Sequence, residues 1–370
     1  TRYRTVTDDR CPRAGYYRCS NITCMEMPTD TADPCDICGA TMMRPVLEVS
    51  LIGVTRAHVH RCPACGFRQV RPRLTAAEIR NLYPSEYFDD ASPVGYVDYA
   101  REFQRRQREA YFLVQWLKRV RPEGQLLEVG CALGFLLAGL KRSGWRLEGV
   151  DASAFAAFYA STRYGLNVTC ATLEEASFQD ERFDVVIQKD LLEHVADPRG
   201  HLNETYRLLR PGGWLRLVTP NGETNLRPLI MAAARPGAML PVLDQGHLSF
   251  FSRGHLLRLF EECGFRCHRM RVIGIRRGLR ALGLLPGQGR FVRQTVAAAP
   301  SPQAAEVSGA VDTERFERLA DRIDRDIAER HSRLRSWPPY FQLHRVMKQF
   351  DSLPARCEVG YDFECLLQRL

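Results

Sequence analysis

Short apolar segments alternate with longer amphipathic ones along the middle of the chain. Apolar runs bounded by Gly, Pro or charged residues predict strands over 126–129, 145–150, 167–170, 182–188 and 214–219. Helices are expected between them, at 135–140 and at 201–209, where an Arg-Pro-Gly-Gly sequence follows. Strands separated by helices predict an α/β fold with a doubly wound parallel sheet, in which ligands bind beyond the carboxyl ends of the strands.

The last third of the chain predicts an excursion from this sheet and a return to it. A helix over 253–263 and a sixth strand over 267–275 are followed by a Gly- and Pro-rich stretch that contains a linker at 297–302. Residues 312–335 predict a charged helix whose intermingled charges indicate a solvated face rather than a nucleic-acid stripe. Its apolar face carries Phe316, Leu319, Ile323 and Ile327. The alternating run 358–367 predicts a returning seventh strand, so that 276–356 would be an insertion capping the active site.

Two cysteine pairs precede these segments. Cys35 and Cys38 form one CxxCG sequence, Cys62 and Cys65 form another, and 23 residues separate Cys38 from Cys62. Two residues between cysteines let a tight turn aim both sulfurs at one ion, and the following Gly permits a positive φ. The alternating stretches 46–51 and 55–61 predict a hairpin between the pairs. We therefore expect a zinc ribbon whose four thiolates leave no open position on the ion, which makes the zinc structural. Redox dithiols or disulfides are the alternative.

The remaining N-terminal cysteines fit no ligand pattern. Cys11, Cys19 and Cys24 lie upstream of the ribbon, and residues 1–33 are the least interpretable part of the chain. The predicted organisation is an unassigned extension (1–33), a zinc ribbon (34–75), a cofactor-binding domain (76–275) and a helical cap or insertion (276–370) with a final strand at 357–370.

Composition narrows the choice of partners. No apolar run in the 370 residues is long enough to span a bilayer, and residues 1–10 show no secretory pattern, so we expect a cytoplasmic protein without a membrane partner. With 52 Lys and Arg against 43 Asp and Glu, the net charge is +9. This balance suits an acidic partner, but the absence of a dense basic run favours ordinary surface charge. Composition does not indicate an oligomeric state.

A ligand-binding corner is expected near residue 125. The strand 126–129 runs into a turn of small residues, Gly130 to Gly134, which opens the helix at 135. Read from Gly130, the sequence lacks Gly at the third and sixth positions of the GxGxxG dinucleotide-binding fingerprint. Glu128 lies two residues before the turn, and Asp151 ends the next strand, where a carboxylate can accept hydrogen bonds from two ribose hydroxyls.

These motifs resemble, in order, those of the class I S-adenosylmethionine-dependent methyltransferases. The segments are LLEVGCALGFLL, GVDAS, FDVVIQKDLLEHVADP and LLRPGGWLRLVTPN, within residues 99–272, and Ala132 stands where the family often has Gly. The ribbon, followed by 70–74 and 82–87, is similar to a subgroup with a zinc ribbon before the methyltransferase domain. Some members of that subgroup methylate sugars or other natural-product intermediates. The resemblance implies a seven-stranded Rossmann-like sheet and S-adenosyl-L-methionine as the cofactor.

The resemblance also implies roles for individual residues. Glu128 and the turn would hold the methionine end of the cofactor, Asp151 its ribose, and Lys189 and Asp190 would lie near the methyl group. Glu174 and Glu175 equally suit a solvated helix start. The full set of implied cofactor contacts is Tyr96, Glu128, Gly130, Cys131, Ala132, Gly134, Asp151, Ala152, Ser153, Thr172, Leu173 and Lys189.

Candidates for the acceptor side come from segments that reach the same edge. The connection 221–251 is long enough to be a lid and contains His247, while His194 follows the fourth strand. Both histidines are general-base candidates because His titrates near physiological pH, and Asp190 is the third catalytic candidate. His194 alternatively only packs at a helix start.

Methyl transfer to a small-molecule or carrier-linked biosynthetic intermediate is the expected function, and the atom methylated is left open. RNA or protein modification is the alternative, in which the ribbon would serve for docking through Arg56, Arg61, Arg68, Arg71 and Arg73. A non-catalytic binding module is the third reading, which the intact cofactor motifs disfavour.

Overall fold

The structure is a computed structural model of the chain. It describes residues 33–51, 54–75, 78–79, 85–88, 99–233, 242–243, 246–282, 284–285, 312–335, 352–354 and 360–370. The cysteines at 11, 19 and 24, Tyr96 and the linker at 297–302 lie outside these ranges. None of the helices within them has the length and apolar character needed to cross a bilayer.

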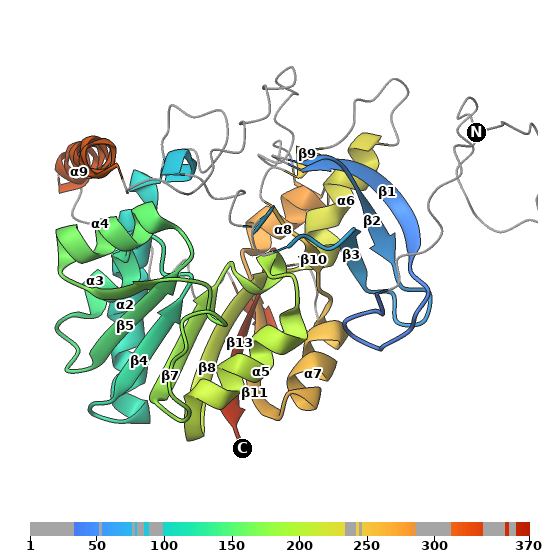
Figure 1. Cartoon of the computed structure of the whole chain (residues 1–370), viewed down its shortest axis with the longest axis horizontal. Coiled ribbons are helices and arrows are strands. Elements are labelled where there is room, and N and C mark those ends of the chain that lie inside the picture. Colours follow the sequence, from blue (N-terminus) through green and yellow to red (C-terminus); the bar gives the residue numbers. More distant parts are fainter. Residues whose placement is uncertain are drawn as a thin grey trace, which may run out of the picture.

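A large mixed sheet forms the centre of the molecule (Figure 1). Five neighbouring strands are parallel, in the order β8-β7-β4-β5-β6, as the sequence predicts for a doubly wound fold. Their bounds are β4 Gln125–Val129, β5 Arg146–Asp151, β6 Asn167–Cys170, β7 Phe183–Lys189 and β8 Leu209–Pro220. β8 begins before the expected strand at 214 because the Arg-Pro-Gly-Gly sequence continues the strand and its register with β7 shifts there.

Helices cover both faces of this sheet, so the α/β Rossmann-like fold class is confirmed. Val185 and Ile187 of β7 pack in a cluster with α2 (Ala100–Val120) and α3 (Phe135–Leu140), whereas Val186 packs in the cluster of α5 (Pro198–Leu208) and α7 (Arg253–Glu262). Successive strand residues point to opposite faces, which is why an unbroken apolar strand serves both clusters. α4 (Ala154–Tyr164) follows β5 and opens with a Ser153 cap.

The returning strand lies inside the sheet. β13 (Asp362–Arg369) pairs antiparallel with β8 on one side and with β11 (Phe265–Ile273) on the other. A short strand, β12 (Ser352–Pro354), extends the sheet beyond β11, so the sheet has eight strands in the described part of the chain where seven were expected. The excursion between β11 and β13 includes α8 (Ile275–Ala281) and α9 (Thr313–Arg335).

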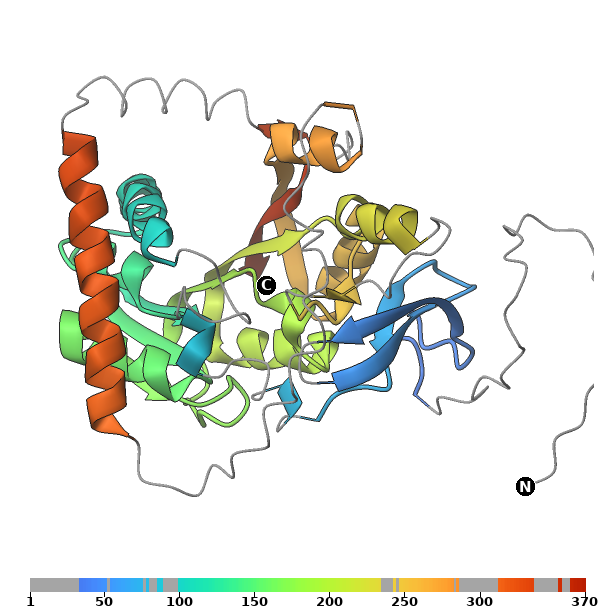
Figure 2. The same ribbon diagram turned by 90° about the horizontal axis from the view of Figure 1, so that it is seen from above.

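α9 docks on the opposite side of the molecule from the cysteine-rich segment (Figures 1 and 2). Its apolar face is buried against α4, where Phe316 meets Phe155 edge to face with ring centroids 5.3 Å apart. Arg163 of α4 forms ion pairs with three of its acidic residues, Glu317, Asp321 and Asp324. The predicted charged helix is therefore held by its apolar face and by part of its charged face.

The ribbon is a second, five-stranded sheet. The predicted hairpin is β1 (Arg44–Leu51) with β2 (Val54–Arg61), and β3 (Arg68–Arg71) pairs with β2. The two outer strands, β9 (Val242–Leu243) and β10 (Ser249–Phe250), come from the long connection between β8 and α7, which also contains α6 (Gly222–Ala233). The connection expected to be a lid is therefore joined to the ribbon.

The interior position of β13 predicts an unequal cost of truncation across the sheet. Phe363 is fully buried, so Phe363→Ala is expected to lower the free energy of unfolding by about 3–5 kcal/mol. Leu353 on the edge strand β12 is 38% exposed, so Leu353→Ala should cost less than about 1 kcal/mol. Denaturant unfolding of both variants checks this, and equal costs would contradict the central position of β13.

Candidate functional site

The turn between β4 and α3 adopts the backbone shape that its small residues allow. Gly130, Ala132 and Gly134 have positive φ values of 68°, 47° and 72°. At Gly134 a Cβ would also meet Leu166 Cδ1 at 2.7 Å, so only Gly fits that position. Ala132 tolerates its φ because its backbone N–H donates a 2.7 Å hydrogen bond to Asp151.

Asp151 ties this turn to the next strand. One carboxylate oxygen accepts from the N–H of Ala132 and the other from the N–H of Ser153, at 2.9 Å. A carboxylate has about four acceptor positions, so these two bonds leave capacity for ribose hydroxyls. Burial raises the pKa of Asp151, and the two backbone N–H groups oppose that rise. Asp151 is thus fixed at the carboxyl end of β5, as the sequence predicts, and Ala152 and Ser153 follow it there.

Glu128 provides the test of whether the corner suits the expected cofactor. Its side chain is buried and its Oε2 atom has no hydrogen-bond partner among the described residues. Burial raises its pKa to about 8, against the lowering effect of Arg106. An orphaned buried carboxylate oxygen costs free energy unless a donor meets it, and a cationic amino group is such a donor. The methionine end of S-adenosylmethionine carries that group, so the residues present fit the cofactor.

The other implied contacts fall into two groups. Cys131 is buried, and its thiol lies 3.8 Å from the carbonyl of Ala132, so it can offer a ligand only its backbone. Thr172 and Leu173 follow β6 in a single turn rather than a helix, where Leu173 is buried in the core. Glu174 bonds to His201 at 2.8 Å, and this contact lowers the pKa of Glu174 to about 2 despite desolvation. Glu174 is therefore occupied by a structural partner.

Lys189 is the last residue of β7 and Asp190 follows it, and the two differ in exposure. Lys189 is buried, and its Nζ lies 3.0 Å from Glu109 of α2, which also receives a bond from Arg216 at 2.6 Å. Lys189, Arg216 and Arg106 together hold the pKa of Glu109 well below its ordinary value, against the effect of desolvation. Asp190 is exposed with a φ of 53°, a strained value for a non-glycine residue, at the carboxyl edge of the sheet.

The two histidines predicted for the acceptor side come together, although more than fifty residues separate them. The rings of His194 and His247 have centroids 4.9 Å apart, and their Nε2 atoms lie 3.6 and 4.0 Å from Glu193 Oε1. His194 follows β7 in the 3-10 turn Leu192–His194, and its Nδ1 donates to the carbonyl of Gly246 at 3.1 Å. That bond leaves the lone pair of the neutral ring on Nε2.

Burial shifts the pKa values of all three groups in the direction that favours their uncharged forms. It lowers the pKa of His194 to about 4 and holds that of His247 well below its ordinary value. It also raises the pKa of Glu193, whose Oε2 accepts from Thr219 at 2.9 Å while Oε1 has no hydrogen-bond partner among the described residues. One carboxylate oxygen of Glu193 and one ring nitrogen each of His194 and His247 all lie within 4.8 Å of one another. The arrangement places two imidazole rings at the carboxyl edge of the sheet, beside Asp190.

Two carboxyl groups of this edge were missed by sequence reasoning. Glu193 stands inside the quoted KDLLEH segment, but its spacing carried no signal that it would face His247 from a distant segment. Asp362 opens β13 and is buried, and burial with Asp190 nearby raises its pKa to about 7. A charged residue within the alternating final strand was the available signal.

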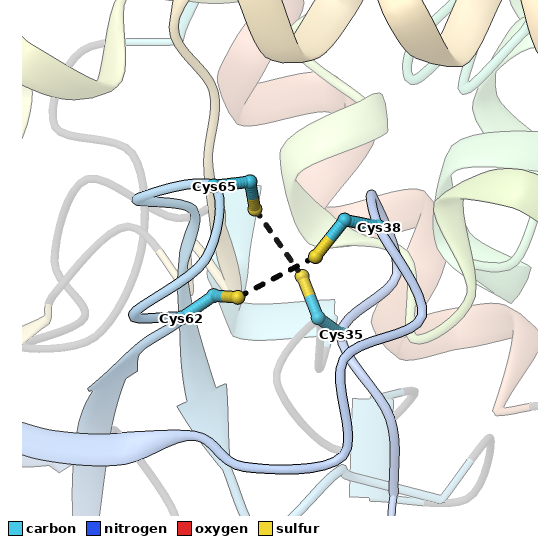
Figure 3. A group of neighbouring side chains, drawn as sticks. All are labelled: Cys35, Cys38, Cys62 and Cys65. Carbon is cyan, nitrogen blue, oxygen red and sulfur yellow. Dashed lines mark hydrogen bonds between the residues drawn. The ribbon is translucent and has the colours of Figure 1, made fainter.

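The four predicted metal ligands converge from two loops (Figure 3). The Sγ atoms of Cys35 and Cys65 are 3.6 Å apart, and those of Cys38 and Cys62 are 3.5 Å apart. Tetrahedral zinc with Zn–S bonds of about 2.3 Å separates its sulfurs by roughly 3.8 Å, so the donor set fits that ion. Gly39 and Gly66 have positive φ values of 73° and 82°, as expected, and each donates to the carbonyl of the first cysteine of its pair.

Part of this chain is similar to known methyltransferases. Residues 102–269 match the model of a family described as a methyltransferase domain. A ubiquinone biosynthesis O-methyltransferase of Parvibaculum lavamentivorans is 33% identical over 124 residues, 32% of this chain and 49% of that protein. One of Colwellia psychrerythraea is 28% identical over 152 residues, 39% of this chain and 61% of that protein. The chain thus spans about half the length of the curated relatives it matches.

One solved structure is similar to part of this chain. The S-adenosylmethionine-dependent methyltransferase of Thermotoga maritima described as a possible histamine N-methyltransferase is 25% identical, with a TM-score of 0.36, over 48% of this chain and 79% of that one. The segment 102–269 that matches a methyltransferase domain includes the turn after β4 and the five parallel strands β4 to β8.

Proposed function

We propose that this protein transfers the methyl group of S-adenosylmethionine to an oxygen of a small-molecule or carrier-linked acceptor. The observation that carries the proposal is the neutral pair His194 and His247, which lies at the same sheet edge as the cofactor corner at Glu128 and Asp151. The curated relatives are named O-methyltransferases of ubiquinone biosynthesis, which favours an oxygen acceptor on a small molecule.

The residues of the corner would bind and orient the cofactor. Glu128 would receive its amino group, the turn Gly130–Gly134 would lie against its methionine end, and Asp151 would accept from its ribose. When bound, the cofactor would supply a methyl group whose carbon is attacked in line by an aligned lone pair of the acceptor, with the sulfur leaving as the neutral thioether of S-adenosylhomocysteine. Alignment supplies most of the rate in such a displacement. Among the other implied contacts, Cys131 would contribute backbone and Leu173 an apolar wall.

His247 and His194 would take the proton of the acceptor hydroxyl. A general base must be unprotonated and within reach of the acceptor, and burial lowers the pKa of both rings, that of His194 to about 4. Asp190 is exposed at the carboxyl edge of the sheet and would contact the acceptor. The four cysteines would hold a structural zinc ion, because four thiolates leave no position for an acceptor.

The structure gives less support to docking of RNA through the ribbon. Of the arginines proposed for that surface, Arg68 pairs with Glu223 at 2.6 Å, and Arg71 is buried with bonds to Asp33, Pro34 and Gln69. Arg73 pairs with Asp36 and bonds to the carbonyl of Ala196. These guanidinium groups have partners within the chain, so the small-molecule acceptor is the proposal.

The direct test is methyl transfer with an unbiased acceptor pool. Purified protein and methyl-labelled S-adenosylmethionine are incubated with an extract of the source organism, which is then separated into RNA, protein and small-molecule fractions. We expect label among small molecules. Label confined to RNA or protein would overturn the acceptor class, and a chain that fails to bind S-adenosylhomocysteine would overturn the activity.

Glu128 predicts a pH dependence of cofactor binding. In the free protein its pKa of about 8 leaves it mostly protonated at pH 7, so a cationic amino group must displace that proton. Affinity for S-adenosylhomocysteine should therefore rise about 25-fold between pH 6.5 and 8.5. Titration calorimetry checks this with Glu128→Gln, which should bind weakly with little pH dependence. The control Glu148→Gln alters a carboxylate that pairs with Arg182 instead, and it should keep the wild-type profile.

His247 predicts a loss confined to the chemical step. His247→Asn should lower kcat by about 10²–10⁴-fold, the usual contribution of a general base, while the affinity for S-adenosylhomocysteine stays within twofold. His268→Asn changes a histidine of β11 that bonds to Gln368 on the exposed surface, and it should leave kcat unchanged. Full activity of His247→Asn would exclude His247 as the base.

A further inference from the structure

The ribbon contacts the acceptor side through the backbone of both its edges. β9 pairs with β1 in parallel, and β10 pairs with β3, with Ser249 opposite Gln69. Both outer strands belong to the connection that carries His247. Strand addition of this kind is held by main-chain hydrogen bonds, so it fixes the path of the added segment whatever its side chains are.

Leu248 joins the ribbon to the turn of His194. Its carbonyl accepts from the N–H of Val70 in β3 at 2.8 Å, and its own N–H donates to the carbonyl of Glu193 at 2.7 Å. One residue earlier lies His247, and one before that is Gly246, whose carbonyl holds His194. The position of His247 over Glu193 therefore depends on a backbone segment that is bonded to the ribbon on one side and to the catalytic edge on the other.

The cysteine loops themselves pack on the methyltransferase domain. The carbonyl of Cys65 accepts from His255 Nε2 of α7 at 3.0 Å, and Phe67 packs against Phe251 with ring centroids 5.5 Å apart. In the other loop, Arg199 of α5 donates to the carbonyl of Asp36 at 2.9 Å. These contacts place the four-cysteine site between α5, α7 and the strand β3 that bonds to Leu248.

The cofactor corner is supported separately. The N–H groups of Gly130 and Cys131 donate to the carbonyl of Val150, and that of Ala132 donates to Asp151, so β5 holds the turn. The two halves of the site therefore rest on different supports, β5 for the cofactor and the ribbon for the acceptor.

We propose that the ribbon is a positioning element of the acceptor site: the four-cysteine centre fixes β3, and β3 fixes His247 over Glu193 and His194. Metal at the cysteines then governs acceptor binding and proton removal while cofactor affinity stays unchanged. The inference rests on the proposed function for its kinetic readout, but its structural readout does not.

Hydrogen–deuterium exchange of the full-length protein tests the proposal. Metal is removed with a zinc chelator and the loss is verified by elemental analysis. Exchange over 246–251 should accelerate at least about tenfold, because it reports local opening, whereas exchange over 126–134 should change less than twofold. Unchanged exchange at 246–251, or equal acceleration of both segments, would overturn the proposal, since the second result indicates a purely stabilising ribbon.

A variant that keeps all four cysteines guards against general unfolding. His255→Ala removes the bond to Cys65 together with the bond that His255 Nδ1 accepts from the N–H of Ser252, and it should accelerate exchange over 246–251, with His268→Ala of β11 as the control. With an acceptor in hand, His255→Ala should raise its KM about tenfold while the Kd for S-adenosylhomocysteine stays within twofold. A shift in the Kd alone would contradict the proposal. If no methyl transfer is found but 246–251 responds as expected, the proposed function fails and the positioning role stands.

Discussion

The antiparallel pairing of β13 with β8 and β11 is the constraint on which the rest of the sheet depends. β8 is the last parallel strand, and β11 reaches the sheet only through β13. The excursion that contains α9 must therefore return to the middle of the sheet. That return places Asp362 at the edge where β7 and β8 end, and it sets Tyr361 to accept from the N–H of Asn221 and to donate to Asn225.

The buried carboxyl groups near this edge differ in whether they have cationic partners. Around Glu109, the cations Lys189, Arg106 and Arg216 compensate one buried carboxylate, which stays ionised. Glu128 and Glu193 are buried without a close ion pair of that kind, so their pKa values rise. A buried carboxyl group without a charged partner in the protein is a place where a ligand can supply that partner. Glu128 lies at the cofactor corner and Glu193 beside the two histidines.

The sequence predicted the features that depend on local spacing. Strand and helix alternation, the paired cysteines with their glycines, the small-residue turn and the returning strand near 358–367 all appear at or near the expected positions. The fit of the individual cofactor and catalytic residues to their roles stays a prediction. Contacts between distant segments were beyond reach, because no spacing rule joins Leu248 to Val70 or Glu193 to His247. The addition of β9 and β10 to the ribbon was missed for the same reason, since two-residue strands carry no periodicity.

The shared ribbon sheet has a consequence for the order of events during synthesis. β3 ends at Arg71, and its neighbour β10 begins at Ser249, nearly 180 residues later in the chain. At a ribosomal speed of about 5–20 residues per second, the edges of the ribbon wait roughly 10–40 s for their partners. Unpaired edges attract other chains, and charged edge residues oppose such association. Arg44 of β1 and Arg68 of β3 stand on those edge strands, so the nascent ribbon carries its own protection until β9 and β10 emerge to cover it.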